Sequence, residues 1–141
     1  MFFANTGRDE LRRRYVEAWR RRREALPLEP LDAQIADIIA LHPEYHALLE
    51  APDASAQDFS VEQGRSNPFL HMGLHLAIRE QLATRRPPGI ELVHARLAST
   101  LGDVHAAEHR MIEVLAEALW EAQRAGRAPD EQRYLERLRS L

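Results

Sequence analysis

Apolar residues recur along this chain at intervals of three and four positions, which is the spacing of residues on one face of an α-helix. No stretch shows the period-two alternation that is typical of a half-buried β-strand. The pattern predicts helices over about residues 8–25, 32–41, 67–84, 90–101, 103–125 and 129–141. We therefore predict an all-α fold, a single-domain helical bundle of five to six helices over residues 1–141.

Prolines and polar residues mark where the helices are interrupted. Pro43 disfavours helical geometry at His42, so the second helix either kinks there or is followed by a further helix that runs to about Glu50. Residues 51–66 carry Pro, Asp, Ser and Gly, and we expect them to form a loop long enough to act as a lid. We expect Thr6 to cap the first helix.

Composition removes several classes of chemistry. The chain has no cysteine, which excludes disulfides, thiolate zinc sites, iron–sulfur clusters and thiol catalysis. All 19 basic residues are arginine, so lysine-dependent phosphate loops and Schiff-base catalysis are excluded as well. No apolar run approaches the roughly 18 residues of a membrane span, and no apolar signal core follows Met1. We expect a soluble, cytoplasmic protein that does not enter a membrane.

The charges are unevenly distributed along the chain. Residues 1–25 hold eight arginines and four acidic residues, whereas residues 26–64 hold eight acidic residues and no arginine. The basic first helix either pairs with the acidic segment inside the protein or forms a surface for a protein partner. Nucleic-acid binding is disfavoured because the formal net charge of the whole chain is −3.

The histidines are the most informative feature of the sequence. Six of the seven form three pairs with a spacing of four residues, namely His42 and His46, His71 and His75, and His105 and His109. Residues four apart lie on one face of a helix and can bind one metal ion. These six histidines are therefore our candidate metal ligands. Pro43 can break the helix between His42 and His46, so the spacing alone does not place these two rings on one helix face.

Two of the pairs lie on apolar stripes that should face the core. His71 and His75 share a face with Ile78, and His105 and His109 share a face with Ile112. A buried imidazole needs a partner, and a divalent transition metal such as Zn or Fe would satisfy several at once. The alternative is that these histidines, like His94, are core residues that hydrogen-bond a carbonyl or carboxylate group.

Two carboxylates lie inside the histidine pairs, Glu44 in the first and Glu108 in the third. A metal ion held by three or four histidines, with one coordination position left open, would bind a water molecule there and lower the pKa of that water. Glu108 or Glu44 could then accept the proton of that water as a catalytic base. A carboxylate in this position can instead orient a ligand histidine.

Residues 42–46, 67–81 and 105–126 together resemble a bacterial family catalogued as domain of unknown function 1841. The resemblance covers nearly the whole chain and implies a small single-domain protein without an assigned activity. The string H-x-x-E-H at residues 105–109 is also similar to that of the inverzincin metalloproteases. This pair, followed by Arg110 on a late helix, is also similar to DinB-type metal-binding bundles. Paired histidines on several helices are similar to haemerythrin-like di-iron bundles.

Two hypotheses follow. In the first, the protein binds one or two transition-metal ions through the paired histidines and acts as a metal-dependent hydrolase or a redox protein. In the second, it is a non-enzymatic interaction module whose histidines lie in the core and whose arginine-rich first helix binds a protein partner. The sequence specifies neither the small molecule or partner bound nor the oligomeric state.

Overall fold

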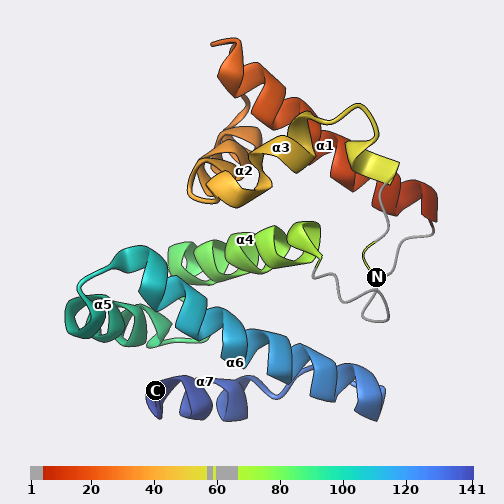
Figure 1. Ribbon diagram of the computed structural model, residues 1–141. Coiled ribbons are helices and arrows are strands. Elements are labelled where there is room, and N and C mark those ends of the chain that lie inside the picture. The colour runs from red at the N-terminus through yellow and green to blue at the C-terminus, as the bar shows by residue number, and fades with distance from the viewer. Residues whose placement is uncertain (1–4, 57–58, 60–66) are drawn as a thin grey trace. The chain divides into compact units, whose positions relative to one another are not determined.

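The computed structural model describes residues 5–56, 59 and 67–141, and within them every regular element is a helix (Figure 1). The elements are α1 (Asn5–Arg23), α2 (Pro30–Ala40), η1 (Pro43–Tyr45), α3 (His46–Glu50), η2 (Ala54–Ala56), α4 (Pro68–Thr84), α5 (Ile90–Leu101), α6 (Val104–Ala125) and α7 (Glu131–Arg139). The all-α prediction is confirmed. The chain divides into two compact units, Met1–Met72 and Gly73–Leu141. That they form one domain stays a prediction.

The described residues contain seven α-helices, so the predicted count of five to six is wrong. The additional helix arises at Pro43, where His42 adopts a non-helical geometry with φ −125° and ψ 70°. This geometry ends α2 and lets a 3-10 turn and then α3 begin, because a residue before proline avoids helical dihedrals. Of the two alternatives at Pro43, the structure contains the separate second helix.

Several predicted boundaries also differ from the structure. Thr6 lies inside α1, which begins at Asn5, so Thr6 is not its cap. The same helix ends at Arg23, because Ala25 adopts a positive φ of 54°. Of the expected loop and lid over residues 51–66, residues 54–56 form η2, whereas 57–58 and 60–66 lie outside the described residues. Among the residues that the structure describes, no helix combines the length and hydrophobicity that a bilayer-spanning segment requires.

The first unit is built around α1, which packs against α2, α3 and η2. The buried residues of α1 include Tyr15 and Trp19, whereas Leu11, one helical turn before Tyr15, is exposed. The ring of Tyr15 packs edge-to-face on Phe69, with 5.8 Å between ring centroids. The apolar face of α2 contributes Ile35 and two further isoleucines to the same interior.

Arginines of α1 pair with acidic residues of α2 within the first unit. The Arg14 Nε atom lies 2.7 Å from the Asp32 carboxylate, and an Arg22 guanidinium nitrogen lies 3.0 Å from that of Asp37. These contacts support internal pairing of the basic helix with the acidic segment. A protein-binding role for this helix stays a prediction, and these two arginines are already engaged.

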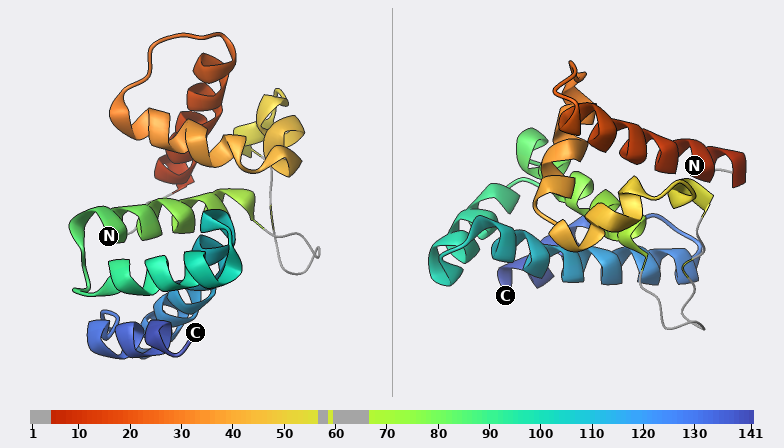
Figure 2. Two further views of the ribbon diagram at one scale, coloured as in Figure 1. Left: turned by 90° about the vertical axis from the view of Figure 1, so that its left-hand side faces the viewer. Right: turned by 45° about the horizontal axis from the view of Figure 1, so that its top comes forward.

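The second unit packs most of α4 with α5, α6 and α7 around an apolar core. Figure 1 and the left view of Figure 2 both place α4 on one side of α5 and α6, and α7 on the other. Gly102, at φ +71°, ends α5 in the left-handed conformation that glycine adopts without strain. The Asp103 carboxylate then accepts a hydrogen bond from the backbone N–H of His105 at 3.1 Å and caps α6. This short turn determines where α6 starts.

Candidate metal centre

Two helices of the second unit bring four of the predicted site residues together. His75 comes from α4, and His105, Glu108 and His109 come from the N-terminal turns of α6. Spacings of three and four residues place the α6 side chains on one side of that helix. The imidazole nitrogens available as ligands on the three histidines lie within 4.8 Å of one another. The structure therefore gathers histidines from two of the predicted pairs at one place.

His75 and Glu108 form the buried base of this cluster. They are 0 % and 3 % exposed, and the Nδ1 atom of His75 lies 2.5 Å from Oε1 of Glu108. The Nε atom of Arg79, one helical turn after His75, donates a hydrogen bond to the same oxygen at 3.2 Å. The carboxylate is therefore held by two residues of α4.

These contacts determine the charge of Glu108. Burial by itself would raise the pKa of Glu108, but the hydrogen bond from His75 and the charge of Arg79 outweigh it and hold that pKa below its usual value. Glu108 is then ionised at neutral pH and can only accept hydrogen bonds. His75 donates this hydrogen bond from Nδ1, and in the neutral ring its Nε2 atom then presents a lone pair.

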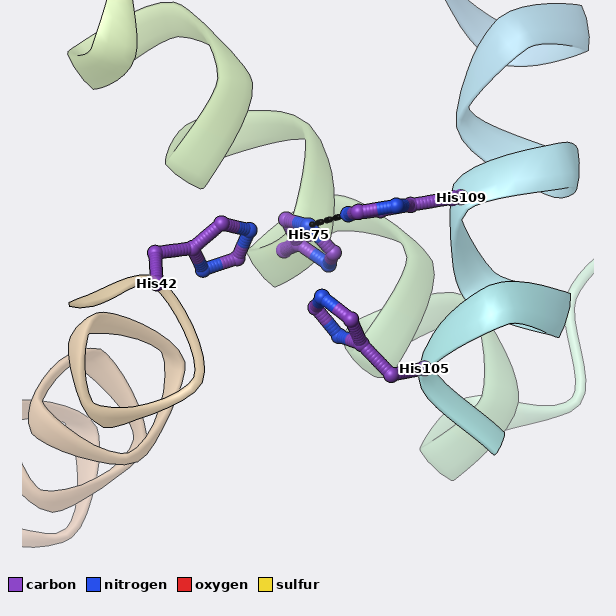
Figure 3. A group of neighbouring side chains, drawn as sticks. All are labelled: His42, His75, His105 and His109. Carbon is purple, nitrogen blue, oxygen red and sulfur yellow. Dashed lines mark hydrogen bonds between the residues drawn. The ribbon is translucent and has the colours of Figure 1, made fainter. Parts of the chain in front are cut away.

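That lone pair is directed at His109. The two Nε2 atoms lie 3.1 Å apart, and Figure 3 shows the rings of His75, His105 and His109 turned toward one another. When His75 presents this lone pair, the Nε2–H of His109 donates the hydrogen bond. When His109 instead carries its hydrogen on Nδ1, both Nε2 lone pairs can face one cation. The separation is close to the roughly 3.3 Å between two nitrogens that bind a tetrahedral zinc ion at about 2.05 Å.

The third ring completes the cluster. His105 stacks nearly parallel to His75, with 5.2 Å between centroids and 3° between planes, and its centroid lies 4.2 Å from that of His109. His105 and His109 are half-buried, whereas His75 is fully enclosed. Three imidazoles would leave at least one position of a four-coordinate ion for another ligand.

The possible metal ligands of the cluster include no carboxylate oxygen. Within the described parts of the chain, no Asp or Glu oxygen joins this group of ligand atoms. The carboxylate-rich donor set of ferritin-like di-iron bundles is therefore not found in this group, and the haemerythrin-like analogy stays a prediction. The two bonds to Glu108 suit a carboxylate that orients a ligand histidine, the arrangement found behind most histidine metal ligands. A proton-accepting role for Glu108 stays a prediction.

The remaining predicted residues belong to the first unit. His42 is buried, and its Nδ1 atom lies 2.7 Å from the carbonyl oxygen of Ile38. The Nε2 atom of His46 lies 2.8 Å from the carbonyl oxygen of Ile39, and its ring stacks on Trp19 with 4.4 Å between centroids. These bonds are the ones expected of core histidines. A ligand role for His42 and His46 stays a prediction.

His71, at the start of α4, contacts His42 edge-to-face with 5.1 Å between centroids. Glu44 is exposed on η1. For both residues the predicted site role stays a prediction. The expectation for His94 is not met, because its buried Nε2 atom has no hydrogen-bond partner among the described residues.

Sequence reasoning did not identify Arg79. The available signal was its position four residues after His75, which places both side chains on one face of α4. Arginine is so frequent in this chain that the spacing carried little information by itself. The contact with Glu108 depends on how α4 and α6 pack.

Comparison with known proteins places the chain in a family. No curated protein and no solved structure matches it. The model of a family described as a domain of unknown function (DUF1841) matches residues 7–140, so the chain belongs to that family.

Proposed function

We propose, for this member of a family without an assigned activity, that the second unit binds one divalent transition-metal ion through His75, His105 and His109. The observation that carries the proposal is a chain of two contacts. Oε1 of Glu108 lies 2.5 Å from Nδ1 of His75, and Nε2 of His75 lies 3.1 Å from Nε2 of His109. A carboxylate that accepts a hydrogen bond from one nitrogen of a buried imidazole fixes the direction of the other nitrogen. It also makes that second nitrogen a stronger metal ligand. Borderline imidazole donors suit Zn, Fe, Cu and Ni.

The bound ion would carry the chemistry of the protein. With three protein ligands, an ion such as Zn²⁺ retains a position where it can polarise a substrate or lower the pKa of a water molecule. A metal-dependent hydrolase is the function that we propose first. If the resident ion is Fe or Cu, the same position would instead support redox chemistry.

Metal binding can be tested by calorimetric titration of chelator-treated protein with Zn²⁺. We expect about one equivalent to bind to the unmodified chain and none to the double variant His75→Ala/His109→Ala, because one ligand cannot hold the ion. The matched control is His94→Ala, which removes a histidine of the same unit that lies outside the cluster and should leave the stoichiometry unchanged.

Stoichiometric Zn²⁺ on a folded double variant would contradict the proposal. So would an unmodified chain that binds no metal and melts at the same temperature with and without a chelator. Circular dichroism of each variant shows that the helices are retained and keeps loss of metal distinct from loss of fold.

A further inference from the structure

The donors around this site are all electrically neutral. His75, His105 and His109 each offer an imidazole nitrogen, and within the described residues no Asp or Glu belongs to the group. Every carboxylate ligand would cancel one unit of an ion's charge. A divalent ion on these three rings would therefore retain both of its positive charges toward any further ligand.

The carboxylate that lies behind the site is neutralised by Arg79. Glu108 is buried, and the Nε atom of Arg79 lies 3.2 Å from the oxygen that also contacts His75. The side chain of Arg79 is 25 % exposed, so its cation lies at the margin of the cluster. Carboxylate and guanidinium together add no net charge to the surroundings of the ion.

We propose that the exogenous ligand of this metal site is a small anion, and that Arg79 sets this preference through Glu108. The inference rests on the proposed metal binding and adds the class of ligand that the ion takes. None of the protein ligands offsets the charge of the ion. An anion at the open position would reduce that charge, whereas a neutral ligand of the same shape would leave it unchanged. The half-buried rings of His105 and His109 put part of the cluster within reach of solute.

The test uses the full chain loaded with Co²⁺, whose visible absorption reports its ligands. Acetate and acetamide serve as probes, because they have nearly the same shape and differ in charge. We expect acetate to change the spectrum at a concentration at least tenfold lower than acetamide does. Arg79→Met should weaken acetate binding on the order of tenfold, the effect of one uncompensated charge nearby, and change acetamide binding less than about twofold.

Two further variants separate charge from structure. Arg79→Lys keeps the cation and should retain the preference for acetate. Arg110→Met removes an arginine of α6 that lies 3.7 Å from Glu113, and it should behave as the unmodified chain. Loss of the preference in Arg79→Lys as well, or an Arg79→Met protein with unchanged preference, would overturn the role of Arg79.

The two proposals fail in different ways. If Co²⁺ produces no absorption from the protein, the metal-binding proposal itself is wrong. If Co²⁺ binds and acetate and acetamide act at equal concentrations, metal binding stands and the inferred anion preference is wrong.

Discussion

At the scale of single residues, Glu108 shows how one carboxylate decides what a neighbouring histidine can do. Its oxygen accepts a hydrogen bond from Nδ1 of His75, so in the neutral ring the opposite nitrogen is a hydrogen-bond acceptor directed at His109. Without the carboxylate, the imidazole could carry its hydrogen on either nitrogen and turn about its side-chain bonds. We therefore expect Glu108 to act through His75, as a positioning residue.

Glu108→Gln should lower the affinity for Zn²⁺ by about 10- to 100-fold, because an amide accepts the His75 hydrogen bond more weakly than a carboxylate does. Competition with a chelating dye measures the loss. Glu113→Gln is the matched control, since that carboxylate lies on the same helix with its side chain 72 % exposed, and its affinity should stay within about twofold. Equal affinities for both variants would show that Glu108 does not position a ligand.

At the scale of elements, the start of α6 determines where two of the three rings lie. Asp103 is extended, with φ −156° and ψ 123°, and its side chain caps the backbone N–H of His105. His105 lies in the first turn of the helix, which frays when its cap is removed. His109 lies one turn further along, where the hydrogen bonds of the helix are complete.

Asp103→Ala should lower the free energy of unfolding by about 1 kcal/mol and weaken Zn²⁺ binding several-fold, because the first turn no longer holds His105 in place. The comparison is Asp130→Ala, which removes the cap of α7, a carboxylate 3.1 Å from the backbone nitrogen of Arg133. It should have a similar effect on stability and none on affinity. Chemical denaturation measures the free energy of unfolding, and dye competition measures the Zn²⁺ affinity. An equal loss of affinity in both variants would show that the cap at Asp103 has no specific role in holding His105.

At the scale of the whole molecule, tyrosines link stability to alkaline pH. Burial raises the pKa of Tyr15, in the first unit, to about 12. Burial also raises the pKa of Tyr134, in the second unit, although its hydrogen bond to Gln81 partly offsets the effect. Between pH 10 and about 12 the unfolded chain loses phenolic protons that the folded chain keeps, so the free energy of unfolding falls as the pH rises.

Tyr15→Phe should remove part of that fall. Its free energy of unfolding should decline less steeply between pH 9 and 12, by an amount on the order of 1–2 kcal/mol, because phenylalanine has no proton to lose. Tyr45→Phe, at a half-buried position, should change the slope less. Urea denaturation at each pH provides the measurement, and identical slopes for Tyr15→Phe and the unmodified chain would contradict the assignment.

The sequence by itself determined the helices and much of the chemistry. Periodicity placed α4, α5 and α6 to within a residue or two, because side chains that recur every three to four positions favour a helix with one buried face whatever it packs on. Gly102 and Asp103 marked a boundary for the same local reason. The absence of cysteine and lysine removed whole reaction classes. The spacing of four residues identified the candidate ligand histidines.

Only the tertiary structure decided which of those residues meet. A periodic pattern states which face of a helix is buried, but it does not state which helix that face contacts. The meeting of His75 with His109, and the bonds of Glu108 to His75 and Arg79, join positions about 30 apart in the sequence and depend on how α4 packs against α6. The break at Pro43 is intermediate, because the proline made two outcomes available locally and the structure contains one of them. Spacing along the chain is a local property, whereas a site is made by side chains that approach through space.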